Sequence, residues 1–183
     1  RYDIMSKLIT CNNFNEYSVM NKIIKFILNG KDIALVSDAG TPCISDPGYR
    51  LVNNCHKNNI QVLSIPGPSS VTSALSISGL PTDSFYFSGF LPRKKGRKTK
   101  FEILAQISST IIIFESPNRI LKTLKDIYNS MGNRVVSLCK EITKIHENVY
   151  LGYVNDIRNE FESKNSIKGE YVILIAKENY KIK

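Results

Sequence analysis

The sequence predicts an α/β protein made of two units that join near residue 85. Short apolar runs alternate with amphipathic stretches along the 183 residues, a pattern typical of a sheet covered by helices. The segment 79–92 interrupts this alternation with two prolines, two glycines and a short aromatic run. We therefore expect one α/β domain over residues 1–84 and a second over residues 85–183.

The first unit is expected to alternate strands and helices. The expected strands are 7–11, 33–36 and 61–65, and each is followed by an expected helix, over 16–29, 46–55 and 69–78. The second of these helices has a recognisable start, because Asp46 can cap free amides and Pro47 suits a first helical turn. Strands that are joined through helices run parallel, with right-handed crossovers. The sequence therefore predicts a parallel sheet in this unit.

The second unit contains more expected strands than helices. An aromatic strand is expected within 79–92, and further strands over 110–114, 134–139, 149–151 and 171–176. Ser116 and Pro117 repeat the cap-then-proline pattern, which predicts a helix to about residue 130. With 42% hydrophobic residues, the chain can bury a sizeable core.

The chain is basic, with a formal net charge of +9 and a pI near 9.4. A basic excess favours polyanionic partners, because each neutralised phosphate releases counterions, although a Lys-rich proteome would give the same excess. The four cysteines form no C-x-x-C pair and the two histidines lie in no cluster of metal-ligand type, so no metal site is expected. No apolar run approaches the ~20 residues that span a bilayer, and we expect a cytoplasmic protein with free thiols.

Two loops of the first unit are rich in Gly, Pro and Ser where strands are expected to end. In S-D-A-G-T-P-C-I-S-D-P, Asp38 can accept hydrogen bonds from a ribose or an ammonium, and Gly40 allows close backbone approach. In I-P-G-P-S-S, Ser69 or Ser70 can cap the following helix while free amides face a ligand, and a purely structural turn is the alternative. Neither loop carries G-x-G-x-x-G or a Walker A motif, so a Rossmann dinucleotide site and a P-loop ATPase lack their signature.

The second unit offers two charged segments. Glu115 is expected at a strand end and Arg119 in the first turn of a helix, where a cation opposes the helix dipole and an anion partner is favoured. Six of the eight residues in 93–100 are basic. Such a run is either a solvated loop or a set of contacts that position a phosphate backbone without reading sequence.

These motifs together resemble those of one family. The runs S-D-A-G-T-P, I-P-G-P-S-S, G-F-L-P-R-K-K-G-R-K, I-F-E-S-P-N-R, C-K-E-I-T-K-I-H-E and K-G-E-Y-V-I-L-I follow one another over nearly the whole chain. Their order and spacing are similar to the ribosomal RNA small-subunit 2′-O-ribose methyltransferase I family of the tetrapyrrole-methylase superfamily, which modifies a cytidine. The resemblance implies a two-domain tetrapyrrole-methylase-like fold, with a parallel sheet in the first domain, a mixed sheet in the second, and S-adenosyl-L-methionine in the interdomain cleft.

The resemblance also implies a homodimer and a partner in small-subunit ribosomal RNA or the 30S subunit. Its implied cofactor contacts are Asp38, Ala39, Gly40, Thr41, Ser70, Val71, Phe114, Glu115 and Glu170. We expect RNA contacts at Arg93, Lys94, Lys95, Arg97, Lys98 and Arg119. Methyl transfer from a sulfonium needs no metal, but a ribose hydroxyl must lose its proton. Glu115 and Glu141 are the candidate bases, and a salt bridge of Glu141 with Lys140 or Lys144 is the alternative.

The chain also departs from the family pattern. A first strand with a P-I-G-N-like loop and an E-D-T-R motif would lie before Arg1, so we expect the chain to be a fragment. Where relatives have H-x-H-N, this chain has N-N-F-N at 12–15. The alternative functions are a tetrapyrrole methylase of the same fold, which would not need the basic run, and a non-catalytic RNA-binding or assembly domain, which would not need the two Gly- and Pro-rich loops.

Overall fold

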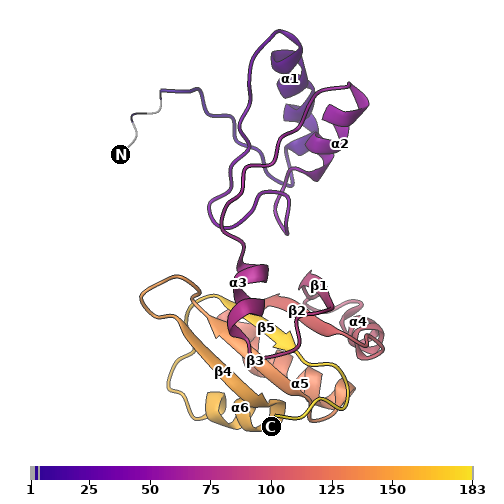
Figure 1. Cartoon of the computed structure of the whole chain (residues 1–183), viewed down its shortest axis with the longest axis vertical. Helices are drawn as coiled ribbons and strands as arrows, with labels where there is room; N and C mark the ends of the chain where they lie inside the picture. Colours follow the sequence, from indigo (N-terminus) through magenta and orange to yellow (C-terminus); the bar gives the residue numbers. More distant parts are fainter. Residues whose placement is uncertain (1–2, 4, 183) are drawn as a thin grey trace. The chain divides into compact units, whose positions relative to one another are not determined.

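The computed structural model describes residues 3 and 5–182 (Figure 1). The chain divides into two compact units, Arg1–Ser69 and Ser70–Lys183. Among the described residues, no helix has the length and apolar character needed to cross a membrane.

The second unit is built on one five-stranded mixed sheet in the order β1-β2-β5-β3-β4. Its strands are β1 Phe85–Phe90, β2 Thr110–Glu115, β3 Val135–Lys140, β4 Asn148–Tyr153 and β5 Tyr171–Ile175. β1 and β2 are parallel, whereas β5 and β3 pair antiparallel with their neighbours. The mixed sheet of the second unit is thus confirmed, and each expected strand is present within a residue or two of its predicted bounds.

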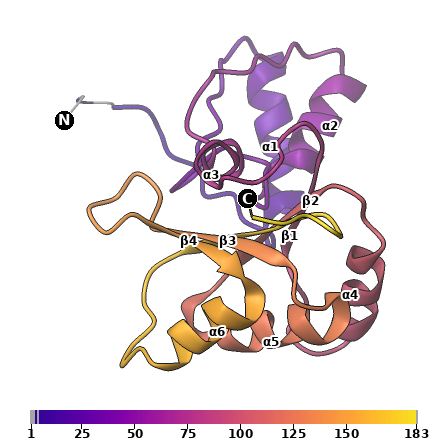
Figure 2. The same cartoon turned by 60° about the horizontal axis from the view of Figure 1, so that its bottom comes forward.

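Helices cover both faces of this sheet (Figure 2). The helices of the unit are α3 Ser70–Ile77, α4 Arg97–Ala105, α5 Ile120–Met131 and α6 Val154–Glu162, with a short 3-10 turn at Pro117–Arg119 before α5. α4, α5 and α6 lie on one face and α3 on the other. The sequence pattern did not predict α4 or α6, because α4 begins inside the basic run and α6 is strongly polar.

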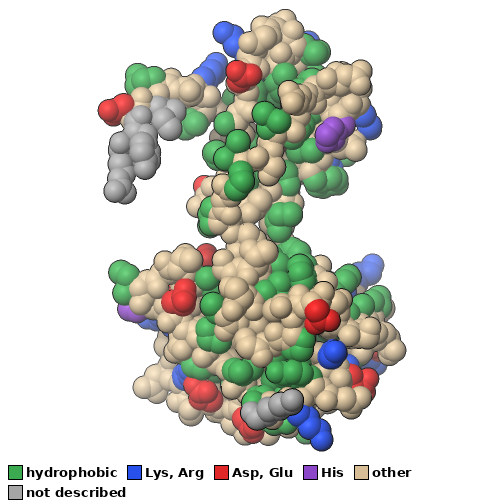
Figure 3. Space-filling view, viewed as in Figure 1, with side chains coloured by type: hydrophobic (Ala, Val, Ile, Leu, Met, Phe, Trp, Pro, Cys, Tyr) green, Lys and Arg blue, Asp and Glu red, His purple; other side chains and the backbone are tan. Residues whose placement is uncertain are grey.

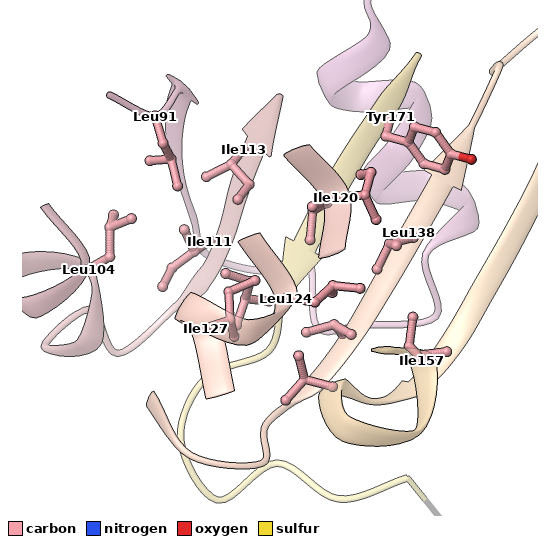
Figure 4. Packing of buried hydrophobic residues seen from close by; sticks show 14 of the residues in the cluster. Leu91, Leu104, Ile111, Ile113, Ile120, Leu124, Ile127, Leu138, Ile157 and Tyr171 are labelled. Atoms are coloured by element: carbon pink, nitrogen blue, oxygen red, sulfur yellow. The ribbon is translucent and has the colours of Figure 1, made fainter. Parts of the chain in front are cut away.

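The main core lies between the sheet and the three helices on one face (Figure 4). Residues of one strand alternate between the two faces, so Ile111 and Ile113 pack against these helices while Ile112 faces the other way, toward α3. From α5, Ile120 and Leu124 enter the main core, and both are fully buried. This packing fixes α5 against the carboxyl end of β2, where the candidate site of this unit lies.

α3 belongs to the second unit although the sequence boundary was expected between residues 84 and 85. Val71, Ala74 and Leu75 are buried against the sheet, together with Leu80 from the segment that follows. The compact units therefore divide at Ser69/Ser70. A composition shift marks a loop, but the boundary between cores depends on which sheet a helix covers.

The first unit contains α1 Glu16–Leu28 and α2 Tyr49–Lys57, which pack through Ile23, Ile24, Leu51 and Cys55. α1 falls where the sequence predicts it, whereas α2 begins at Tyr49, after the predicted start at Asp46 and Pro47. The expectation of a parallel sheet in this unit is wrong. Within residues 3 and 5–69, the segments 7–11, 33–36 and 61–65 form no strand. They make no ladder, and many of their apolar side chains lie at the surface of this unit (Figure 3). Apolar patterning marks a segment that can form a strand, whereas a strand exists only when a neighbour supplies its hydrogen bonds.

Candidate functional site

The two Gly- and Pro-rich loops of the first unit are linked by a hydrogen bond. Thr41 donates from Oγ1 to the carbonyl oxygen of Pro68 at 2.9 Å. Ser37 turns the first loop back on itself by donating to the carbonyl of Gly40 at 3.3 Å. Gly40 has φ +72°, and a Cβ there would meet no atom within 4 Å, so open space adjoins this backbone. Asp38 is exposed beside it. The structure thus brings together two of the predicted loops and leaves a carboxylate and a glycine backbone accessible.

A buried carboxylate from α1 holds the start of α2, a role that the sequence assigned to Asp46. Glu16 Oε1 accepts the amide N–H groups of Gly48 and Arg50 at 3.1 and 3.2 Å, and its Oε2 accepts from the Arg50 guanidinium at 3.0 Å. Asp46 makes no capping hydrogen bond, because the helix begins only at Tyr49, after Gly48. This is a correction, and no local signal could have found it, since Glu16 lies 32 residues from Gly48.

Arg50 completes this support of the first loop. Its guanidinium lies 5.0 Å from the centre of the Tyr17 ring and 4.8 Å from that of Tyr49. The hydrogen bond to Glu16 raises the pKa of Arg50 above its ordinary value. Gly48 has φ +130°, which strains any other residue, and a Cβ there would lie 2.6 Å from a methyl carbon of Leu35, so that side chain would have to shift. The end of the loop is therefore fixed by packing as well as by charge.

Ser70 and Val71 open α3. The Val71 side chain is buried against the sheet of the second unit. Its proposed contact with a cofactor can therefore involve only its backbone.

Glu115, a predicted base and cofactor contact, is buried at the carboxyl end of β2 and is only 2% exposed. Its Oε1 accepts the Ser116 N–H at 2.9 Å and lies 3.1 Å from Nε of Arg119. Its Oε2 accepts the hydroxyl of Thr123 at 2.6 Å. With both oxygens engaged and solvent excluded, Glu115 is placed to anchor its surroundings. Burial and these three contacts favour a structural role over that of a base.

Arg97 is a further departure from the expectation, because it is only 5% exposed and its donors point inward. Nε lies 2.7 Å from Oδ2 of Asp126, Nη2 donates to Thr123 Oγ1 at 2.8 Å, and Nη1 donates to the Pro92 carbonyl at 3.1 Å. A buried guanidinium with these partners cannot also reach a phosphate. We therefore leave Arg97 out of the RNA-contacting set.

Arg119, a predicted RNA contact, pairs with Glu115 of the same unit. Its Nη2 donates to the Leu91 carbonyl at 2.8 Å. Arg119 and Arg97 thus bind the carbonyls of two successive residues, Leu91 and Pro92. Arg119 contacts Glu115 directly, whereas Thr123 links Arg97 to Glu115. We call Glu115, Arg119, Thr123, Arg97 and Asp126 the buried relay. It fixes the segment that leads from β1 into the basic run.

The exposed part of the basic run is smaller than the sequence suggested. Arg93, Lys94 and Lys95 are exposed in a turn, and Lys98 is exposed in the first turn of α4. Lys98 lies 3.9 Å from Glu102, a weak surface pair. The structure thus presents four exposed cations directly after the pinned carbonyls.

Glu141 lies in the turn after β3 and forms a salt bridge with Lys144, which the sequence offered as the alternative to a role as base. Its Oε1 accepts the Glu170 N–H at 2.8 Å and the Lys144 ammonium at 3.0 Å, and Lys144 also lies 3.1 Å from Glu170. The backbone hydrogen bond from Glu170, followed by Lys144, lowers the pKa of Glu141. Glu141 has φ +49°, and Gly169 packs so closely that a Cβ would lie 2.7 Å from the Glu141 Cγ. Its carboxylate is therefore held in one place and kept ionised.

Phe114 is partly buried near the carboxyl end of β2, next to Glu115. Its ring contacts Phe87 and Phe90 edge to face, at centroid distances of 5.0 and 5.5 Å. Within residues 3 and 5–182, no three His, Cys, Asp or Glu side chains gather as a metal site would require.

The family model described as Tetrapyrrole (Corrin/Porphyrin) Methylases matches residues 12–157. Three relatives carry the name Ribosomal RNA small subunit methyltransferase I. The chain is 41% identical to the one from Thermotoga maritima, 44% to that from Hydrogenobaculum sp. and 41% to that from Halalkalibacterium halodurans, over 97%, 97% and 99% of its own length. It spans 80%, 78% and 63% of these relatives, respectively.

Solved structures show the same fold at low sequence identity. The methyltransferase CobJ matches 92% of this chain and 74% of its own, with a TM-score of 0.67 and 13% identity. A diphthine synthase matches 96% and 77%, with a TM-score of 0.65 and 13% identity. A uroporphyrin-III C-methyltransferase from Thermus thermophilus, complexed with S-adenosylhomocysteine, matches 87% and 73%, with a TM-score of 0.57 and 14% identity.

Proposed function

Because this chain belongs to the ribosomal RNA small subunit methyltransferase I family of the tetrapyrrole methylases, we propose that it methylates the 2′-oxygen of a cytidine ribose in small-subunit ribosomal RNA. The family assignment makes it a methyltransferase. The observation that supports an RNA substrate within this fold is the identity of 41–44% to relatives named for ribosomal RNA, against 13–14% to the tetrapyrrole and diphthine enzymes. We expect it to act in the cytoplasm and to form a homodimer. Sedimentation would test the homodimer.

The proposed cofactor is S-adenosyl-L-methionine, which supplies an activated methyl group. In the first unit, the exposed Asp38 carboxylate and the open backbone at Ala39, Gly40 and Thr41 fit a ligand with hydroxyl and amine donors. The bond from Thr41 to Pro68 would hold the second loop, and with it the backbone before Ser70, in a fixed relation to the first. In the second unit we propose Phe114 and Glu170 as contacts. Glu115 follows Phe114 in β2 and pairs in register with Tyr171, the residue after Glu170, so it would support both contacts by fixing this end of the strand.

Asp38 is the residue with which to test the cofactor proposal. Asp38→Ala should weaken binding of S-adenosylmethionine by about 1–3 kcal/mol, the loss expected for a hydrogen bond to a charged group. Asp46→Ala is the matched control, because Asp46 lies in the same loop without a capping role. Calorimetry with both variants decides the matter, and an unchanged affinity in Asp38→Ala would remove Asp38 from the site.

Of the two candidate bases, we propose Glu141. It is ionised and held in place, whereas both oxygens of Glu115 are engaged in burial. A lowered pKa keeps a base free of its proton but also weakens it, so the expected contribution is at the low end of the range of about 10²–10⁴-fold. If Glu141→Gln keeps the full rate and binds the cofactor normally, Glu141 is not the base, and solvent takes the proton of the ribose hydroxyl.

The reaction is tested by supplying labelled methyl to small subunits or their RNA. Label should reach the RNA, and the product should resist alkaline cleavage at one nucleotide, because a methylated 2′-oxygen cannot attack the neighbouring phosphate. Label on a base would refute the ribose assignment while leaving the methyltransferase intact. Label on a tetrapyrrole and none on RNA would refute the substrate.

Replacing Arg93, Lys94, Lys95 and Lys98 with Gln tests the RNA surface. Each lost phosphate contact should reduce the log–log salt slope of RNA binding by roughly 0.7–0.9. Cofactor affinity should not change. An unchanged slope would make these residues a solvated surface only.

A further inference from the structure

Phe90 is a large apolar side chain left 60% exposed at the last position of β1. β1 is an edge strand of the sheet, and Phe90 pairs in register with Phe114 of the parallel neighbour β2. It therefore lies at the carboxyl end of the parallel pair, the end at which ligands of α/β sheets are held. A lone exposed apolar residue needs no explanation by itself, so its surroundings decide the matter.

The ring of Phe90 is held in a defined place. Its edge-to-face contact with Phe114 has a centroid distance of 5.5 Å, and Phe114 is in turn braced by Phe87. On the carboxyl side, Leu91 is buried and its carbonyl accepts a hydrogen bond from Arg119. The next carbonyl, that of Pro92, accepts a hydrogen bond from Arg97. The buried relay thus fixes the backbone directly after Phe90, and a rigid ring loses little entropy when a ligand covers it.

Cations follow the ring immediately. Arg93, Lys94 and Lys95 are exposed and begin three residues after Phe90. An extended chain covers at most about 3.6 Å per residue, so Arg93 lies within roughly 11 Å of Phe90 along the backbone. An apolar ring and a row of cations at this spacing match an unpaired nucleotide strand, whose base offers a π face and whose phosphates offer charge.

We propose that Phe90 is a stacking platform for an unpaired nucleobase of the RNA substrate, beside phosphates bound by Arg93, Lys94 and Lys95. This proposal rests on the proposed function, because it assumes an RNA substrate. It adds that the RNA must be single-stranded at this point, since a base inside a duplex cannot stack on a side chain. A second copy of the chain is a poorer occupant of this surface, because two copies that met here would bring their exposed basic turns together. We expect the proposed homodimer to use another surface.

Phe90→Leu tests the proposal, with Phe85→Leu as the matched control. Phe85 is 46% exposed at the opposite end of the same strand, so its loss costs similar apolar surface away from the basic turn. The probes are a short single-stranded RNA and a duplex of the same sequence, each titrated against the full chain at several salt concentrations. Phe90→Leu should weaken single-stranded binding about 5- to 150-fold, the range for a lost base–aromatic stack. Its salt slope should stay unchanged, because the ring carries no charge.

Phe90→Trp should bind the single strand as tightly as the wild type or more tightly, which keeps the test valid if the Leu variant folds poorly. The duplex should bind both variants like the wild type. Single-strand binding unchanged in Phe90→Leu, or lost equally in Phe85→Leu or Phe90→Trp, would overturn the proposal. So would a shift of Phe90→Leu to monomers in sedimentation with RNA affinity intact. Failure of the wild type itself to bind or methylate RNA would instead refute the proposed function.

Discussion

Thr123→Val is expected to destabilise the second unit far more than its small change in shape suggests. The fully buried Thr123 hydroxyl donates to Glu115 Oε2 at 2.6 Å and accepts from Arg97 Nη2 at 2.8 Å. A hydroxyl can do both at once, whereas the nearly isosteric valine can do neither. The substitution therefore leaves a carboxylate oxygen and a guanidinium nitrogen buried with one partner fewer each.

The size of the effect follows from those two losses. A hydrogen bond to a charged group contributes about 1.5–3 kcal/mol, so losing both should cost about 3–6 kcal/mol. For a unit of this size, such a loss lowers the melting temperature by roughly 10–20 °C. Urea unfolding should show a lower midpoint with an unchanged slope, because the surface exposed on unfolding stays the same.

Thr110→Val is the matched control. Thr110 is also buried, at the start of β2, but its hydroxyl makes one hydrogen bond, to the Pro81 carbonyl at 2.6 Å. Losing one neutral bond should cost only about 1 kcal/mol. Equal losses of unfolding free energy in the two variants would refute the reasoning, because they would show that the relay contributes no more than an ordinary buried hydroxyl.

Three further predictions concern single positions. Gly48→Ala should lower the urea midpoint of unfolding much more than Gly30→Ala, because a Cβ would lie 2.6 Å from a leucine methyl at the first site and meets open space at the second, and both have positive φ; similar shifts would contradict this. Glu141→Gln should reduce the melting temperature at neutral pH but not at pH values below the lowered pKa of Glu141. A carboxyl group with a lowered pKa stabilises the fold at pH values above the pKa that it has in the unfolded chain, and this contribution is lost as the pH falls through its pKa in the folded protein. A difference in melting temperature that persists in acid would exclude ionisation of Glu141 as its cause. Burial raises the pKa of Cys139 to about 11, so the contribution of this thiol to stability is present below the ordinary thiol pKa and is lost as the pH rises toward 11. In a chain with the other cysteines replaced, alkylation of Cys139 at pH 8 should be far slower in the native protein than after unfolding. Equal rates would show that the thiol is accessible in the native protein.

The elements of the second unit could be predicted because their patterns are local. The run T-I-I-I-F became β2 and Y-V-I-L-I became β5, with every side chain of β5 buried. Ser116 and Pro117 marked the start of a helical segment correctly, although its first turn is a 3-10 helix. The basic run hid α4 from prediction, because a helix whose first turn is crowded with cations shows no apolar periodicity.

The roles of charged residues could not be predicted in the same way. Arg97 and Arg93 have the same side chain in the same run, yet one is buried and the other exposed. What separates them is Asp126, which lies 29 positions away along the chain and meets Arg97 only when α4 packs against α5. Glu141 differs in this respect, because Lys144 lies only three residues away and the salt bridge could be named as an alternative from the sequence.

The sequence by itself determined the family, through the order and spacing of its loop motifs, and the positions of most helices and strands, through periodicity that a few neighbouring residues already express. Only the tertiary structure decided that 33–36 and 61–65 form no sheet in the first unit, that Glu16 rather than Asp46 holds the start of α2, and that Glu115 anchors a buried relay. The physical reason is the same in each case. Strand pairing and the satisfaction of a buried charge depend on groups that are distant in sequence, and these meet only when the chain has folded.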